Sequence, residues 1–89
     1  MVEIRTFEIT NRLGIHARVA VKLVETASRF QSEIFLEKDG VEVNGRSILG
    51  ILTLFCPRGS WLTIRAEGVD AGEAMEAFAR LIAEKFSEG

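Results

Sequence analysis

GIHARVAVKLVETASR, residues 14–29, contains the only histidine of the chain, His16, followed by an apolar pattern that is typical of an amphipathic helix. The apolar positions follow an i, i+3, i+4, i+7 spacing, at Ala20, Leu23, Val24 and Ala27. This spacing predicts a helix from about His16 to Arg29, with His16 at or near its N-terminus. Backbone N–H groups without intrahelical partners and a partial positive charge would stabilise an anion attached to the imidazole there.

The chemistry of His16 and Arg18 makes a phosphoryl group the candidate anion. Neutral imidazole is a good nucleophile near pH 7, because its ordinary pKa of about 6.5 leaves much of it unprotonated. Arg18 would place a guanidinium beside the phosphate. A lone histidine near an arginine is also common as an ordinary capping or surface residue, so this interpretation depends on the rest of the chain.

Composition limits the other classes of function. We expect one domain over residues 1–89, since 89 residues with 47% hydrophobic content suffice for a single core. The net charge of -2 argues against general nucleic-acid binding. One cysteine, Cys56, and one histidine cannot supply the three or four ligands of a metal site, so we expect no metal and no cofactor. Without a signal-peptide pattern or an apolar run of 18 residues, we expect a cytoplasmic chain that does not insert into a membrane.

The remaining pattern alternates strands and helices. Alternating apolar and polar residues predict a first strand over Thr6–Thr10. Val2 and Ile4 lie in the opposite phase, which indicates that the strand is irregular or partly exposed at its start. Further strands are predicted at 32–37, 41–43 and 61–66, and a short helix at 47–55. Asp70 and Glu73 favour a capped start of the last helix. Its expected buried stripe comprises Ala74, Met75, Phe78, Leu81, Ile82 and Phe86. The order βαββαβα predicts an α+β open-faced sandwich, with one sheet covered on one face by helices.

The short helix at 47–55 has more large apolar residues than one buried stripe can hold. One stripe contains Ile51, Leu54 and Phe55, and the other contains Ile48, Leu49 and Leu52. If the first faces the sheet, the second is exposed and indicates a partner surface, unless a neighbouring loop covers it. Ala17 and Val21 would extend this surface toward His16. We expect positive side chains around it that steer an acidic protein partner, namely Arg12, Arg18, Lys22 and Arg46.

Ser47 stands at the start of the same helix, after Asn44-Gly45-Arg46. Serine is a preferred N-cap residue whether or not it is modified. A phosphate on Ser47 would be tolerated by the helix dipole, yet it would bring about 1.5 to 2 negative charges into the predicted surface and repel an acidic partner. One residue can therefore serve as a cap and as an off-switch.

Two motifs at a fixed distance together resemble the HPr family, the histidine-containing phosphocarriers of the bacterial phosphoenolpyruvate-dependent sugar phosphotransferase system. They are GIHAR at 14–18 and RSILGIL at 46–52. Gly59-Ser60 before the fourth strand and the βαββαβα order extend the resemblance over the whole chain.

The resemblance implies that His16 accepts phosphate on Nδ1 from phosphorylated enzyme I and passes it to IIA domains, with Arg18 assisting. It implies that Ser47 matches the serine modified by HPr kinase/phosphorylase, and that the fold is a four-stranded antiparallel sheet with three helices. Such a protein is a monomeric phosphoryl carrier and not an enzyme with turnover of its own.

Val19 departs from this motif, because the family usually has proline after the arginine. Valine restores a backbone N–H in the first turn, which points toward a specialised paralogue such as a carrier of the nitrogen-related branch. A second alternative is a purely regulatory binding protein that acts through the Ser47 surface. The intact His16-Ala17-Arg18 sequence favours the carrier.

Overall fold

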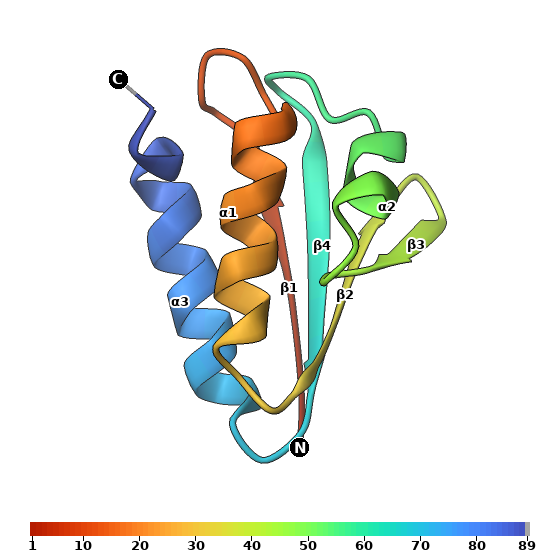
Figure 1. The fold of residues 1–89 in the computed structure, drawn as a ribbon, viewed down its shortest axis with the longest axis vertical. Helices are drawn as coiled ribbons and strands as arrows, with labels where there is room; N and C mark the ends of the chain where they lie inside the picture. The colour runs from red at the N-terminus through yellow and green to blue at the C-terminus, as the bar shows by residue number, and fades with distance from the viewer. Residues whose placement is uncertain (89) are drawn as a thin grey trace.

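The structure, a computed structural model, describes residues 1–88. The chain folds into a four-stranded sheet with helices on one face (Figure 1). Gly89, the last residue of the predicted domain, lies outside the described residues. The elements are β1 (Val2–Glu8), α1 (Ala17–Ser28), β2 (Glu33–Lys38), β3 (Val41–Asn44), α2 (Ile48–Thr53), β4 (Trp61–Glu67), α3 (Ala71–Ala83) and the short turn η1 (Lys85–Ser87). The predicted βαββαβα order and the α+β open-faced sandwich are confirmed.

The sheet has the strand order β1-β4-β2-β3, and all neighbours are antiparallel. β4 is therefore an inner strand, paired with β1 from Val2↔Glu67 to Glu8↔Trp61. Period-two alternation sends Leu62 and Ile64 of β4 to the helix-covered face, where both are fully buried. Trp61, in the opposite phase, is 60% exposed on the open face. The predicted exposure of Val2 and Ile4 is confirmed too.

The core lies between the sheet and the two long helices, which run side by side across it (Figure 1). α1 contributes Ala20, Leu23 and Ala27, three of the four residues in its predicted stripe, as fully buried side chains. Phe78 of α3 is, with Phe86, one of the two largest side chains in this core and is 0% exposed. The core therefore fixes the orientation of α1 and with it the direction in which its N-terminus points.

The end of the short helix differs from the prediction. α2 ends at Thr53, and Phe55 was wrongly expected in its buried stripe. Phe55 adopts a left-handed backbone conformation with φ of 52°, and its side chain is 74% exposed. Because the chain leaves the helix before Phe55, the helical spacing no longer decides where its side chain points. Ile51 and Leu54 are buried as predicted.

The last helix begins at Ala71 as expected, but Asp70 does not cap it with its side chain. The Asp70 carboxylate instead accepts hydrogen bonds from Gln31 N and Ser32 N, both at 2.9 Å, and from Ser32 Oγ at 2.5 Å. The predicted capping box is therefore wrong. The carboxylate is used to tie the start of α3 to the loop between α1 and β2.

Phe86 is buried, at 1% exposure, but it lies beyond α3 and not on its stripe as predicted. Lys85, Phe86 and Ser87 all have left-handed backbone conformations, with φ of 53°, 57° and 55°. Such a conformation costs about 1–2 kcal/mol for each residue with a Cβ atom. Burial of the Phe86 ring and a hydrogen bond from Lys22 Nζ to the Phe86 carbonyl oxygen hold the turn. η1 thereby directs the following residue back toward the start of α1.

Candidate functional site

His16 is the N-cap residue of α1, with extended backbone angles (φ -108°, ψ -176°). The carbonyl oxygen of His16 accepts the first helical bond, from Ala20 N at 2.9 Å. Within residues 1–88, no hydrogen bond engages the N–H groups of Ala17, Arg18 and Val19. The predicted position of His16 at the helix N-terminus is thus correct, and three unbonded donors follow it.

The loop before His16 is held against the segment that follows α2. Ile15 N donates to the Cys56 carbonyl oxygen at 2.8 Å. Gly14 has φ of 67°, and a Cβ atom at this position would lie 2.3 Å from the same carbonyl oxygen. Only glycine combines this conformation with this close approach. The backbone ahead of the imidazole is therefore fixed by contact and not only by the helix.

The His16 ring contacts a carboxylate that sequence reasoning missed. Nε2 lies 2.6 Å from Glu88 Oε2, although the two residues are 72 positions apart. The hydrogen bond from His16 holds the pKa of the Glu88 carboxyl below its ordinary value, so at neutral pH this group is ionised and can only accept. A proton on Nε2 of the neutral ring would complete this hydrogen bond. Nδ1 has no hydrogen-bond partner within residues 1–88.

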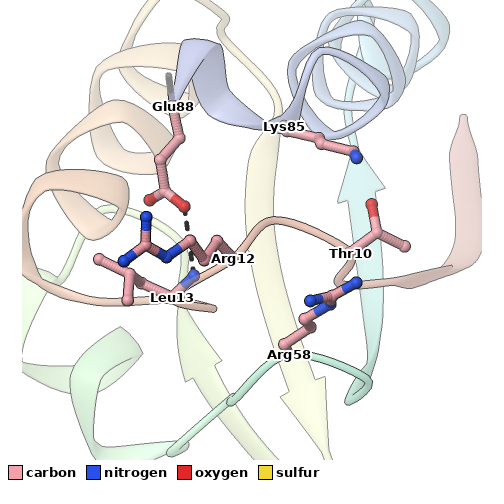
Figure 2. A pocket seen from close by; sticks show the side chains of 6 residues that line it. All are labelled: Thr10, Arg12, Leu13, Arg58, Lys85 and Glu88. Atoms are coloured by element: carbon pink, nitrogen blue, oxygen red, sulfur yellow. Dashed lines mark hydrogen bonds between the residues drawn. The ribbon is translucent and has the colours of Figure 1, made fainter.

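The other oxygen of Glu88 is held by the loop between β1 and α1. Oε1 accepts from Leu13 N and from Asn11 Nδ2, each at 3.2 Å, and Figure 2 shows the contact with Leu13. Asn11 also donates to the Gly14 carbonyl oxygen at 2.7 Å and is 1% exposed. No local pattern in the sequence marks Asn11 or Glu88 as members of this network, and Asn11 and Glu88 lie 77 positions apart.

Beside this network lies an open hollow of about 280 Å³ lined by three cationic side chains, from Arg12, Arg58 and Lys85 (Figure 2). Thr10, Leu13 and Glu88 complete its lining. No ion pair within residues 1–88 involves any of the three cations. The end of the molecule that bears His16 is therefore locally positive, although the net charge of the chain is -2.

The predicted partner-surface residues of α1 follow His16 in the first two turns of the helix. Ala17, Arg18 and Val21 are all exposed, and within residues 1–88 the Arg18 guanidinium has no ion-pair partner. Val19 is buried at 1% exposure, so its side chain belongs to the core. Lys22, expected at the rim of the surface, uses its ammonium group on the Phe86 carbonyl oxygen.

Ser47 is the N-cap of α2, and its Oγ accepts from Gly50 N at 2.9 Å. Ile48, Leu49 and Leu52 are exposed, with Leu49 the most exposed at 77%. Phe55 joins this apolar surface, which we call the α2 surface (Ile48, Leu49, Leu52 and Phe55). α2 packs beside α1, and the hydrogen bond between Ile15 and Cys56 links its far end to the His16 loop.

Arg46 lies at the opposite end of α1 from His16. Its Nη2 donates to the carbonyl oxygens of Ala27, Phe30 and Ser32, at 2.9, 2.7 and 3.1 Å. Arg46 was expected among the cations around the apolar surface, but its guanidinium is committed to carbonyl oxygens at and just after the end of α1. The place of Arg46 next to Ser47 in the sequence did not indicate that its side chain would bond to the end of α1.

The chain is thus an open-faced βαββαβα sandwich that presents an unbonded histidine nitrogen at a helix N-terminus. A family model described as "PTS HPr component phosphorylation site" matches residues 4–84. The chain belongs to this family, the HPr phosphocarriers of the phosphotransferase system.

Individual relatives agree with this assignment. The phosphocarrier protein HPr of Neisseria meningitidis is 41% identical over 85 residues, which is 96% of each chain. The HPr-like protein Crh of Halalkalibacterium halodurans is 46% identical over 82 residues, covering 92% of this chain and 96% of that protein. A crystal structure of HPr from Thermoanaerobacter tengcongensis superposes with a TM-score of 0.93 at 45% identity, covering 98% of both chains.

Within residues 1–88, no helix is long and apolar enough to cross a membrane. No three side chains of histidine, cysteine, aspartate or glutamate gather there in an arrangement that would hold a metal ion.

Proposed function

We propose that this chain accepts a phosphoryl group on His16 Nδ1 from phosphorylated enzyme I and passes it to IIA domains of the phosphotransferase system. One observation carries the proposal. Glu88 engages Nε2, so Nδ1 is the unbonded nitrogen of a histidine that stands at the start of α1. The phosphate would find hydrogen-bond donors in the backbone N–H groups of Ala17, Arg18 and Val19. The unpaired Arg18 guanidinium supplies further donors.

The phosphorylated state would exist only transiently. Nδ1 attacks phosphorus and takes the phosphoryl group, and the next acceptor removes it, so the chain is a carrier and not an enzyme with turnover of its own. The net positive surroundings from Arg12, Arg18, Arg58 and Lys85 suit an acidic partner protein.

Labelling with enzyme I and phosphoenolpyruvate tests the proposal. The wild-type chain should become a phosphoprotein that is labile in acid and stable in base. His16→Ala should abolish labelling while the thermal unfolding midpoint changes little, because the His16 side chain is partly exposed and outside the core. Arg18→Ala should still be labelled, but more slowly in both directions. Labelling of His16→Ala at the wild-type level would contradict the assignment.

Ser47 supports a regulatory role on the same molecule. Its hydroxyl already caps α2, and a phosphate there would remain favourable for the helix while placing negative charge at the edge of the α2 surface. We propose Ser47 as the site for a kinase of the HPr kinase/phosphorylase type.

A purely regulatory binding protein, acting through the α2 surface alone, is the second candidate, favoured by the exposure of Leu49 and Phe55. The labelling experiment separates the two, because only the carrier requires phosphate on His16.

A further inference from the structure

We propose that Glu88 is a positioning residue for His16, and that its carboxylate holds the imidazole in the tautomer with the proton on Nε2 and the lone pair on Nδ1. This inference rests on the proposed function, since it concerns the nitrogen that would accept phosphate. Its basis is the side-chain contact at 2.6 Å between Glu88 Oε2 and His16 Nε2.

The carboxylate is well placed to fix the ring, because it is held at both oxygens. Oε2 bonds the imidazole, while Oε1 accepts from Asn11 Nδ2 and Leu13 N, both in the loop that leads into His16. The side chains of His16 and Glu88 are 33% and 19% exposed. A partly shielded carboxylate with three donors has little freedom to leave the imidazole.

The backbone that delivers Glu88 is itself unusual. Three successive residues with Cβ atoms, Lys85, Phe86 and Ser87, adopt the left-handed conformation just before it. Packing of Phe86 in the core and the bond from Lys22 maintain this turn. Strained backbone that is maintained by its surroundings is concentrated at functional sites in proteins. Here it places one carboxylate beside the only histidine.

The chosen tautomer suits the transfer step. The Nδ1 lone pair forms the new N–P bond as the bond between phosphorus and the donor atom breaks, with the electron pair of that bond returning to the donor. The proton stays on Nε2, the ring becomes positively charged, and the Glu88 carboxylate on the opposite side stabilises this charge. In the other tautomer, a proton would have to leave Nδ1 before it could attack. Transfer to the next acceptor reverses these changes and restores neutral imidazole.

Glu88→Ala and Glu88→Gln test this role, with Glu84→Ala as the matched control. Glu84 is an exposed acidic residue four positions earlier, with no side-chain contact to His16 within residues 1–88. The first measurement is the tautomer of the unphosphorylated ring, from long-range proton–nitrogen correlation spectra at a pH where imidazole is neutral. The second is the rate constant of phosphoryl transfer from phosphorylated enzyme I.

Glu88→Ala should lower the fraction of the Nε2–H tautomer and slow transfer on the order of 10-fold, as the loss of groups that orient histidine commonly does. Glu88→Gln should keep the tautomer, because the amide oxygen still accepts from Nε2, but it should transfer more slowly than wild type because the negative charge is lost. Glu84→Ala should match wild type in both measurements.

An unchanged tautomer ratio in Glu88→Ala would overturn the proposal, and so would a slowing of transfer that Glu84→Ala reproduces. A wild-type chain that enzyme I does not label would instead contradict the proposed function. In that case the tautomer ratio still decides whether Glu88 positions His16.

Discussion

Asp70 is a single carboxylate that joins two parts of the chain. Its contacts to Gln31 and Ser32 connect the first residue before α3 with the loop after α1. The hydrogen bond from the Ser32 hydroxyl, followed by that from Gln31 N, lowers the pKa of Asp70 from its ordinary value. The folded state therefore binds this proton more weakly than the unfolded state does.

We predict that Asp70 contributes stability that is present at neutral pH and lost as the pH falls through its lowered pKa. In acid the unfolded state takes up the proton first, which shifts the equilibrium toward unfolding. In Asp70→Asn this contribution disappears, so the free energy of unfolding should fall less steeply between about pH 5 and pH 2. Urea unfolding over that range measures the slope, with Glu76→Gln, an exposed residue of α3, as control. Parallel slopes for Asp70→Asn and wild type would contradict the prediction.

Individual residues were predictable where a local pattern marked them. His16 lies at a helix start and Ser47 caps a helix, and both positions follow from the residues on either side. Glu88 and Asp70 act on partners 72 and 38 positions away, so no local spacing announces them. The sequence predicted the position of His16 at the helix start but not the carboxylate that contacts its ring.

At the scale of elements, the loop between β1 and α1 depends on Gly14. Its φ of 67° and its approach to Cys56 and Pro57 are both incompatible with a side chain. Gly40, in the β2–β3 turn, also has a positive φ, 83°, but has open space where a Cβ atom would be. Substitutions at these two glycines therefore distinguish the free-energy cost of a left-handed backbone conformation from the cost of a steric clash.

We predict that Gly14→Ala lowers the free energy of unfolding by roughly 2–4 kcal/mol, from left-handed strain plus the clash. Gly40→Ala should cost only about 1 kcal/mol, since strain alone applies. Gly14→Ala should also slow labelling of His16, because the loop that holds Ile15 must shift. Urea unfolding and the labelling rate measure both effects. Equal destabilisation by the two substitutions would show that the contact at Gly14 is unimportant.

The limits of periodicity appear at the ends of helices. Within α1 and α3 the predicted stripes are buried except at Val24 and Leu81, which are only partly buried. Phe55 and Phe86 both follow a helix end, and both take a left-handed conformation that a residue with a Cβ atom rarely adopts. Because this conformation ends the helical repeat, helical spacing could not predict that the Phe55 ring is exposed and the Phe86 ring buried.

At the scale of the whole molecule, positive charge is concentrated near His16 although the net charge of the chain is negative. The cations gathered there have no ion pairs within residues 1–88. The α2 surface provides an apolar area beside them. Association with an acidic partner should then combine steering by charge with burial of apolar side chains, and salt weakens only the first.

We predict that Ser47→Asp and Leu49→Ala both slow phosphorylation by enzyme I, but differ in salt dependence. Ser47→Asp adds repulsion and should slow the reaction about 3–10-fold at low salt, with partial recovery at high salt. Leu49→Ala removes contact area and should slow it roughly 10-fold at either salt concentration. Transfer rates at low and high salt measure the difference, and circular dichroism checks that α2 remains. Wild-type rates for both variants would place the partner elsewhere.

The arrangement of layers was predictable from the whole sequence, because amphipathic helices and alternating strands must share one core. The strand order β1-β4-β2-β3 was not, since it depends on pairing between strands as far apart as Val2 and Glu67. These long-range pairings set where the loops meet. They bring the β1–α1 loop, the segment after α2 and η1 to one end of the sheet (Figure 1).

The contact between His16 and Glu88 also has a consequence for biosynthesis. A ribosome releases His16 and the whole of α1 well before it has joined residues 85–88, because synthesis proceeds at about 5–20 residues per second from the N-terminus. A nascent or prematurely terminated chain that stops within α3 carries the histidine motif but neither Phe86 nor Glu88. Such a chain lacks the carboxylate that contacts the His16 ring, so this contact can form only once synthesis has passed Glu88.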